Sequence, residues 1–240
     1  MNYQTLDWDT NFFGFNVASL DPCIDINELN PLLSELENTG VQLVYWQSEK
    51  KLTGRNMIHN YLLADRKVTF HSLVHEPDKI TLPKDYTIRP FSSNTPTEKI
   101  IDLAIQSGHL SRFAKDPNIP KERFEALYSE WIIKSLSKEL ADEVFILSHH
   151  KTPVGFVSVK KENNKGEIGL IAVDAKHRGR KLGNALMNKA QQWFHINDIT
   201  DSYVVTQEIN DSACRLYQKN HYNLLSKVYF YHFWLHPKLK

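Results

Sequence analysis

The stretch from Ile168 to Ala190 constrains the fold of this chain more than any other segment. It begins with a short apolar run, Ile168–Val173, whose length and β-branched residues predict a buried strand. After a basic turn, apolar residues recur at three- and four-residue steps up to Trp193, which predicts a helix that opens at Gly183. The first N–H groups of a helix are unpaired and carry partial positive charge, so this order of strand, turn and helix predicts an anion-binding site.

The turn adds charged side chains and permissive backbone to that site. Arg178, Arg180 and Lys181 carry full positive charges, and Gly179 and Gly183 allow a ligand to approach the backbone closely. Taken alone, a basic turn of this kind fits a solvated surface loop equally well. Only the order of residues in the turn can distinguish an anion-binding loop from a solvated surface loop.

The six residues Arg178-Gly-Arg-Lys-Leu-Gly183 resemble the Arg/Gln-x-x-Gly-x-Gly/Ala loop of the Gcn5-related N-acetyltransferases, the GNAT superfamily. In that family the loop wraps the pyrophosphate of acetyl-coenzyme A, so the resemblance implies the same co-substrate here. Lys181 occupies the place of the middle glycine, and a left-handed backbone at that position is predicted to cost about 1 kcal/mol. Binding of the pyrophosphate is then expected to depend more on side-chain charge.

The residues after this helix resemble the same family. Ser202–Gln207 is a strand candidate, Asn210 is a good helix N-cap, and Ser212–Lys219 is a short helix candidate. The order is similar to the family's strand, Asn-x-x-Ala-x-x-x-Tyr helix and closing strand. The resemblance implies that Asn210 contacts the pantetheine arm and that Tyr217 protonates the leaving thiolate. A simple N-cap and a core-edge tyrosine are the competing interpretations.

The resemblance also implies that the strand offers its backbone to the coenzyme and that the amine attacks the thioester directly. Cys214 lies on the predicted short helix outside any Cys-His arrangement, so it is expected to pack rather than to react. The residues implied to bind acetyl-coenzyme A are Ile171, Ala172, Val173, Arg178, Gly179, Arg180, Lys181, Leu182, Gly183 and Asn210.

Composition limits the function classes. With 240 residues, 41% of them hydrophobic, the chain can bury a sizeable core in one large or two small domains. A formal net charge of +1 argues against wholesale binding to nucleic acid or to anionic membranes. The two cysteines are far apart and the eleven histidines lack a paired ligand spacing, so no metal site is expected. No apolar run approaches the roughly 18 residues of a membrane span, and a cytoplasmic setting is expected.

Two blocks are predicted, residues 1–76 and 84–240, joined by a linker at 77–83 that is marked by prolines and charges. The elements expected in the first block are strands near Asn16–Leu20, Gln42–Gln47 and Tyr61–Phe70 and helices near Ile26–Asn38 and Lys51–Asn60. Those expected early in the second are strands at Tyr86–Pro90, Glu143–Ser148, Val154–Lys160 and Glu167–Val173 and helices near Pro96–Gly108 and Lys121–Lys138.

Three short motifs resemble one branch of the superfamily, the bacterial dTDP-fucosamine acetyltransferases. They are the W-x-x-x-F-F-G opening from Trp8 to Gly14, the segment Ser111-Arg-Phe113, and a following tryptophan-bearing helix at Tyr128-Ser-Glu-Trp131. The opening is otherwise expected to be a packed N-terminal loop. The resemblance implies an α/β (α+β) class: a GNAT fold with a mixed central sheet flanked by helices, preceded by a smaller, truncated GNAT-like domain.

In that branch the acceptor is a nucleotide-linked 4-amino-4,6-dideoxyhexose, whose amine is acetylated for surface polysaccharide such as lipopolysaccharide O-antigen. The resemblance implies Asp65 as the base, where the family has a glutamate, and Arg112 as a contact to the sugar-nucleotide phosphate. Ion pairing of Asp65 with Arg66 or Lys67, and a cap or salt bridge at Arg112, are the competing interpretations.

Two further function classes stay open. One is an acetyltransferase for a protein N-terminus, lysine or polyamine, and the other is a non-catalytic acyl-coenzyme A-binding module. The sugar epimer, the nucleotide base and the oligomeric state also stay open, a homodimer being the candidate assembly. No nucleic-acid or membrane partner is expected.

Overall fold

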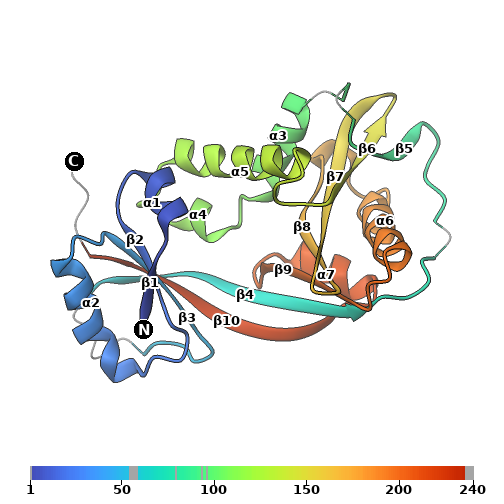
Figure 1. Cartoon of the computed structure of the whole chain (residues 1–240). Coiled ribbons are helices and arrows are strands. Elements are labelled where there is room, and N and C mark those ends of the chain that lie inside the picture. The colour runs from blue at the N-terminus through green and yellow to red at the C-terminus, as the bar shows by residue number, and fades with distance from the viewer. Residues whose placement is uncertain (1, 54–58, 79, 93, 96, 236–240) are drawn as a thin grey trace. The chain divides into compact units, whose positions relative to one another are not determined.

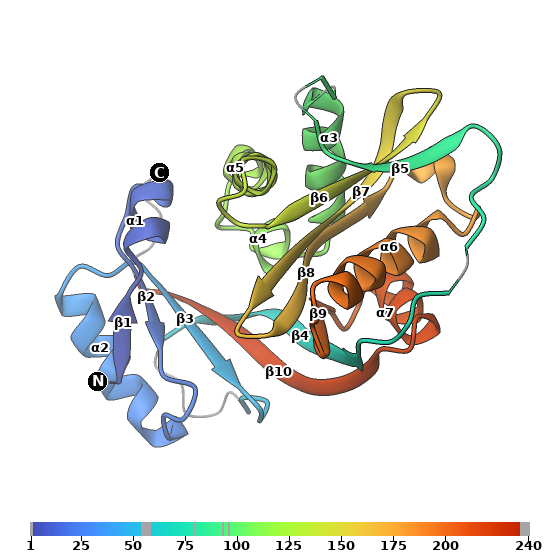
Figure 2. The same cartoon turned by 45° about the vertical axis from the view of Figure 1, so that its right-hand side comes forward.

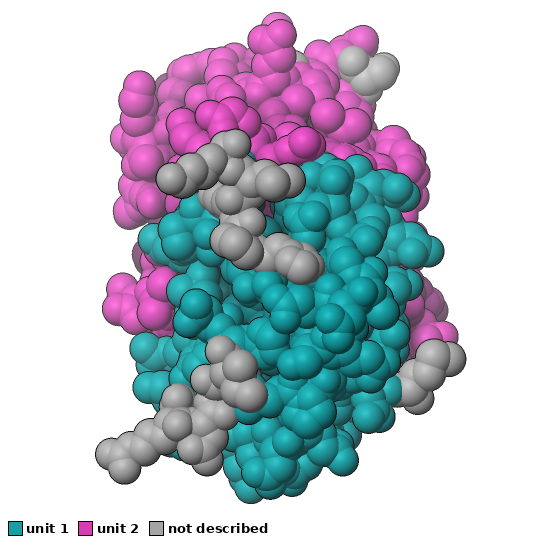
Figure 3. Space-filling view, turned by 90° about the vertical axis from the view of Figure 1, so that its left-hand side faces the viewer, with its two compact units in different colours: residues 1–67, 111–120, 227–240 teal, residues 68–110, 121–226 magenta. Residues whose placement is uncertain are grey.

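The chain forms two compact units that interleave along the sequence. The computed structural model describes residues 2–53, 59–78, 80–92, 94–95 and 97–235. Unit 1 comprises residues 1–67, 111–120 and 227–240, and unit 2 comprises 68–110 and 121–226, coloured teal and magenta in Figure 3. This grouping differs from the expected division into 1–76, a linker at 77–83, and 84–240. Strands β4 (Tyr61–Leu73) and β10 (Asn223–Trp234) each contribute residues to both units.

Unit 1 is a sheet with helices on its faces (Figure 1). Its other elements are β1 (Tyr3–Thr5), α1 (Asp7–Phe13), β2 (Val17–Leu20), the 3-10 turn η1 (Ile26–Glu28), α2 (Leu29–Asn38), β3 (Leu43–Ser48) and α4 (Arg112–Lys115). The strand order is β1-β2-β3-β10-β4, so the last strand of the chain lies inside the sheet between two early ones.

Alternation along β3 and β10 gives the sheet of unit 1 two different faces, because successive side chains of a strand point to opposite sides. Val44 of β3 and Phe233 of β10 belong to the apolar core that includes the leucines of α2. Tyr45 and His232, each one position away, are cross-strand partners with ring centres 4.8 Å apart. The ring of Phe113 from α4 lies 6.5 Å from His232, so α4 covers the face opposite α2.

Unit 2 contains a mixed sheet with helices on both faces. Its elements, besides parts of β4 and β10, are β5 (Tyr86–Pro90), α3 (Thr97–Ser107), α5 (Lys121–Leu136), β6 (Glu143–His149), β7 (Thr152–Glu162), β8 (Lys165–Val173), the 3-10 turn η3 (Ala175–His177), α6 (Leu182–Ile196), β9 (Asp201–Gln207) and α7 (Asp211–Lys219). The strand order is β4-β9-β8-β7-β6-β5, in which β8 and β9 are parallel and the pairs from β8 to β5 are antiparallel.

Alternation also places two separate cores on the faces of this sheet. Phe145 and Leu147 of β6 pack in the cluster that contains the apolar stripe of α6. Their neighbours Val144 and Ile146 pack in a second cluster with residues of α3 and α5. Figure 2 shows α6 on one face and α3 and α5 on the other. The sheet is therefore held between two helical layers, which fixes the backbone of β8.

Most expected elements agree with the structure. The predicted strand Tyr86–Pro90 matches β5, and the predicted helix Lys121–Lys138 matches α5 to within two residues. The expected helix Lys51–Asn60 falls largely on 54–58, which lie outside the described residues, and the described ends of that range are not helical. The N-terminal segment expected as a loop contains the helix α1. Among the described residues, no helix is long and apolar enough to cross a membrane.

Candidate functional site

Strands β8 and β9 separate partway along their length. They pair in parallel from Lys165 opposite Asp201 to Ile168 opposite Val204. The residues that follow in both strands, 169–173 and 205–207, line a cavity of about 800 Å³ in unit 2. An extended ligand arm inserted there would meet strand backbone that the neighbouring strand no longer pairs.

A bulge in β8, where Gly169 and Leu170 lie opposite Ser158 of β7, accounts for this separation. The pairing of β7 with β8 shifts register between Val157 and Val159, and the intervening Ser158 hydroxyl accepts a hydrogen bond from the Leu170 N–H at 2.8 Å. An extra residue on one strand bends it and increases the local twist. The second half of β8 consequently leaves the line of β9.

The loop between β8 and α6 lines the same cavity and presents the start of α6 to it. Lys181, the N-cap residue of α6, is left-handed with φ 59°, at the position where a left-handed backbone was expected to cost about 1 kcal/mol. Gly179 is also left-handed, with φ 79°. The Lys181 side chain makes no cap hydrogen bond, so the first-turn N–H groups and the helix dipole are available to an anion. Arg178 anchors the loop, since its Nε donates to the Val173 carbonyl at 3.1 Å.

Close packing at the start of α6 explains why residue 183 is a glycine. A methyl group on Gly183 would lie 3.2 Å from Leu216 of α7, so α6 and α7 approach each other closely there. Asn210 caps α7, because its Oδ1 accepts a hydrogen bond from the Ala213 N–H at 3.2 Å. The cap interpretation of Asn210 is therefore correct, and its amide N–H₂ remains a donor beside the cavity that Asn210 also lines.

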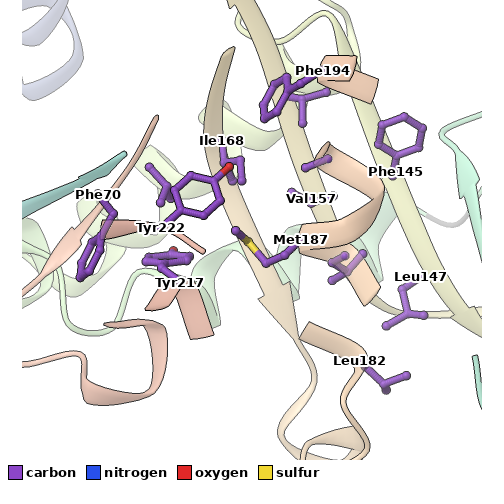
Figure 4. Close-up of a cluster of buried hydrophobic side chains, with 14 of the residues drawn as sticks. Phe70, Phe145, Leu147, Val157, Ile168, Leu182, Met187, Phe194, Tyr217 and Tyr222 are labelled. Atoms are coloured by element: carbon purple, nitrogen blue, oxygen red, sulfur yellow. The ribbon is translucent and has the colours of Figure 1, made fainter. Parts of the chain in front are cut away.

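Tyr217 combines a buried position with access to the cavity. Its side chain is 3% exposed and lines the cavity, and its ring centre lies 5.6 Å from that of Phe70 and 6.4 Å from that of Tyr222 (Figure 4). Burial raises the pKa of Tyr217 well above its ordinary value, and the neighbouring Cys214 and Tyr222 raise it further. The phenol therefore keeps its proton at neutral pH and has one O–H to donate.

The cavity includes residues that were not expected in the site from the sequence. Gln106 and His109 at the end of α3, and Tyr128 of α5, line it. Gly108 is the sequence feature that could have pointed to these residues, because a methyl group there would lie 2.4 Å from the Tyr128 ring. A helix that ends in a glycine packed against a tyrosine holds the exposed His109 beside the cavity.

Of the residues expected to bind the coenzyme, all except Arg180 line this one cavity. The members that do so are Ile171, Ala172, Val173, Arg178, Gly179, Lys181, Leu182, Gly183 and Asn210. Arg180 is not among the described residues that line it. Asp65 and Arg112 belong to unit 1.

Asp65 is a half-buried carboxyl on β4. Burial raises its pKa to about 6, against the opposing effects of the Arg66 backbone hydrogen bond and of the charges on Arg112 and Lys67. Lys67 Nζ donates to Gln47 Oε1 at 2.7 Å. A carboxyl whose pKa lies near 6 is suited to accept a proton close to neutral pH.

Arg112 is the first residue of α4, and the Ser111 hydroxyl caps that helix by accepting from the Ala114 N–H at 3.3 Å. The guanidinium of Arg112 does not cap the helix. Its Nη1 donates to Nε2 of His232 at 2.9 Å, and the Nδ1 of His232 lies 2.6 Å from the Asp116 carboxylate. Arg112 is therefore held by a buried network within unit 1.

Comparison with known proteins shows the fold and a family match for part of the chain. Residues 108–222 match the family model described as Acetyltransferase (GNAT) family. In Bacillus subtilis (strain 168), the spore coat polysaccharide biosynthesis protein SpsD is 23% identical over 138 residues, covering 58% of this chain and 47% of the relative. Streptothricin acetyltransferase A of the same strain is 30% identical over 89 residues, covering 37% of this chain and 51% of the relative.

The chain thus spans about half the length of the curated relatives it matches. Among solved structures, a GCN5-related N-acetyltransferase from Sphaerobacter thermophilus superposes with a TM-score of 0.63 and 14% identity, covering 99% of this chain and 78% of that one. This likeness shows the fold, and the family model covers every residue that lines the cavity except Gln106 and Ser107. The chain has the GNAT fold, with a mixed sheet flanked by helices, and its residues 108–222, just under half of the chain, match the acetyltransferase (GNAT) family model.

Proposed function

We propose that this chain is an N-acetyltransferase that moves an acetyl group from acetyl-coenzyme A to the amine of a nucleotide-linked amino sugar, with a dTDP-4-amino-4,6-dideoxyhexose as the expected acceptor. The cavity between β8 and β9 carries the transferase assignment, because one unit combines a helix N-terminus, a basic loop and a buried tyrosine there. The name of SpsD, a polysaccharide biosynthesis protein, supports a sugar acceptor.

The residues of the cavity fit coenzyme A part by part. The N–H groups that open α6, with Arg178 and Lys181, would hold the pyrophosphate by charge and by hydrogen bonds. The backbone of Ile171–Val173 would hold the pantetheine amides, and the Asn210 amide would donate to the same arm. The left-handed Lys181 and Gly179 turn the loop so that side-chain charge and backbone N–H groups reach one cavity.

Bound coenzyme would supply the acetyl thioester, and the chain's own residues would position it and move protons. Asp65 would take the proton of the acceptor ammonium, so that the free amine attacks the carbonyl carbon. Tyr217 would give its proton to the sulfur as the C–S bond breaks, and the second proton, which the nitrogen loses once the N–C bond has formed, would return to the Tyr217 oxygen through water. Orientation of two reactants alone can supply roughly 7–11 kcal/mol of the barrier, so no covalent nucleophile is required.

The pKa of Asp65 supports its proposed role. Burial raises the pKa of Asp65 to about 6, which leaves the carboxylate ionised at neutral pH yet basic enough to accept a proton. Burial also raises the pKa of Tyr217, so the phenol is protonated at neutral pH and is a weaker acid than an exposed tyrosine. Arg112 would contact the phosphate groups of the acceptor.

The experiment is a coenzyme-release assay against a panel of amines. The panel contains dTDP- and UDP-linked amino hexoses, the same sugars without the nucleotide, streptothricin, an N-terminal peptide, lysine and spermidine. A kcat/KM at least tenfold higher for a nucleotide-linked sugar than for any other amine is expected. Preferred turnover of a phosphate-free amine would instead support the alternative acetyltransferases, and coenzyme binding without turnover of any amine would support a non-catalytic module.

A further inference from the structure

Residues 174–177 set where the loop between β8 and α6 begins. Strand β8 ends at Val173, and Arg178 is the next residue that lines the cavity, so the four residues between them decide where Arg178 lies. None of the four is among the described residues that line the cavity. A loop binds its ligand more tightly when its conformation exists before binding, because less entropy is lost. The contacts of residues 174–177 should therefore affect the affinity of the loop for an anion.

Asp174 organises the start of this loop with four of its polar groups. Its N–H donates to the Val154 carbonyl at 2.8 Å, and its carbonyl accepts from the His177 N–H at 2.8 Å. Its Oδ1 accepts from the Lys176 N–H at 2.9 Å, and its Oδ2 lies 3.2 Å from Nζ of Lys99 on α3. The hydrogen bond from Lys176 and the contact with Lys99 lower the pKa of Asp174, so its carboxylate is ionised at neutral pH.

This carboxylate would oppose anion binding if it were not paired. The Asp174 side chain is only 13% exposed, and it follows Val173, which lines the cavity. Like charges repel more strongly where water is largely excluded. Lys99 places a positive charge 3.2 Å from the carboxylate. The pair is therefore neutral and does not offset the positive charges that Arg178 and Lys181 bring to the cavity.

The other end of residues 174–177 is held from β5. The Tyr86 hydroxyl lies 2.8 Å from Nδ1 of His177, the residue that precedes Arg178. Tyr86 is 7% exposed and packs in the same apolar cluster as Leu186 of α6. The ring centre of His149 lies 4.6 Å from that of Tyr86 and 5.3 Å from that of His177. Because a packed ring has little freedom to move, its hydroxyl fixes His177 and, through the backbone, Arg178.

We propose that Lys99 and Tyr86 are positioning residues for coenzyme binding. They hold the loop through Asp174 and His177, so that Arg178 and the N–H groups that open α6 meet the pyrophosphate together. The inference rests on the proposed function, because the anion is the pyrophosphate of coenzyme A. Neither Lys99 nor Tyr86 is among the described residues that line the cavity, so each acts on the ligand through the loop.

The test measures binding of coenzyme A to the full chain by calorimetry, so that it does not depend on the acceptor. Lys99→Met and Tyr86→Phe are each expected to weaken coenzyme A binding roughly 3- to 10-fold, the effect of one lost hydrogen bond or partly exposed ion pair. Lys99→Arg keeps the positive charge beside Asp174 and should bind coenzyme A nearly as tightly as the unmodified chain. Unchanged affinity in both Lys99→Met and Tyr86→Phe would overturn the proposal.

The charge argument has a test of its own. Asp174→Asn, added to Lys99→Met, removes the uncompensated charge and keeps a side-chain oxygen to accept from the Lys176 N–H. The double variant should therefore recover part of the affinity that Lys99→Met loses. A double variant that binds no better than Lys99→Met would contradict neutralisation of Asp174 as the role of Lys99.

The matched controls are Lys134→Met and Tyr231→Phe. Lys134 forms an ion pair with Glu130 at 2.7 Å on α5, and the Tyr231 hydroxyl accepts from the Leu52 N–H at 2.8 Å in unit 1. These variants lose contacts of the same two kinds away from the loop, and coenzyme A binding should not change. Equal weakening in the controls would mean that a general loss of stability explains the result, and it would contradict the positioning role.

Arg178→Ala distinguishes this inference from the proposed function. If Arg178→Ala weakens coenzyme A binding and neither Lys99→Met nor Tyr86→Phe does, the positioning role fails and the proposed function stands. Unchanged binding in Arg178→Ala would overturn the pyrophosphate assignment itself, and the positioning role with it. Because Tyr86 acts through the loop, Tyr86→Phe should weaken binding less in an Arg178→Ala background than in the unmodified chain. Equal losses in the two backgrounds would contradict action through Arg178.

Discussion

Replacement of Asp65 by asparagine should make the protein more stable and less active. Folding raises the pKa of this carboxyl from 3.8 to about 6, mainly because burial penalises the charged form. At 1.36 kcal/mol per pKa unit the ionised group costs the fold about 3 kcal/mol at pH 7.5. Water screens a half-buried group, so we expect about half of this value, and Asp65→Asn should stabilise by about 1–2 kcal/mol.

The pH dependence tests the cause of that gain. An acid whose pKa is raised by folding contributes its full stability below its unfolded pKa and loses it as the pH rises through the folded value. The gain from Asp65→Asn should therefore be present at pH 7.5, as about 2–8 °C in melting temperature, and absent near pH 3.5. The control is Asp201→Asn, because hydrogen bonds from Thr200 and His71 lower the pKa of Asp201 and its replacement should destabilise at pH 7.5.

Activity should move in the opposite direction to stability. As a general base, Asp65 is expected to contribute roughly 10²–10⁴ to kcat/KM, with an ascending limb near pH 6 that Asp65→Asn removes. Coenzyme affinity should not change. A variant that is destabilised at pH 7.5, or that is stabilised equally at pH 3.5, would refute the burial argument; an unaltered pH–rate profile would refute the role as base.

Four further predictions concern the cavity and the buried network. Arg178→Ala should raise the KM for acetyl-coenzyme A more than Arg180→Ala does, since Arg178 lines the cavity and one charged hydrogen bond is worth roughly 1.5–3 kcal/mol; calorimetry with coenzyme A that ranks them the other way would contradict the loop geometry. Tyr217→Phe should lower kcat by roughly 10²–10⁴ at constant coenzyme affinity, and near-full turnover would reduce it to a packing residue. Lys181→Gly should relieve the left-handed backbone and stabilise by about 1 kcal/mol in denaturant unfolding while weakening coenzyme binding. Because folding lowers the pKa of His232 from 6.5 to about 4, stability should be lost as the pH falls through this range, and His232→Gln should flatten that loss in thermal unfolding curves.

Local sequence patterns were sufficient to predict many of the helices and strands of unit 2. The run Ile168–Val173, the helical stripe after Leu182 and the cap at Asn210 each depend on neighbours a few residues away, and each has the predicted element. Helix α1 shows the opposite case. Its N-cap is Leu6, which makes no side-chain cap hydrogen bond, so the usual polar start signal is missing.

The features that could not be predicted from the sequence depend on contacts between residues far apart in the chain. The bonds from Arg112 and Asp116 to His232 join residues 120 and 116 positions apart, and no spacing rule relates them. The grouping of 111–120 and 227–240 with unit 1 arises in the same way, because it depends on which strands pair rather than on local composition. Tyr128 and His109 were missed because their shared signal, Gly108, has meaning only once the packing partner is known.

The central place of the last strand has a consequence for synthesis on the ribosome. Strand β10 pairs between β3 and β4, although β3 ends at Ser48 and β10 begins only at Asn223. Until residues 223–234 emerge, nascent chains carry β3 and β4 with unpaired edges, which are templates for association with other chains. Unit 1 therefore cannot complete its sheet until β10 has left the ribosome, and β10 also carries His232, the buried partner of Arg112. Premature termination shortly before β10 should yield aggregation-prone chains rather than a folded N-terminal unit.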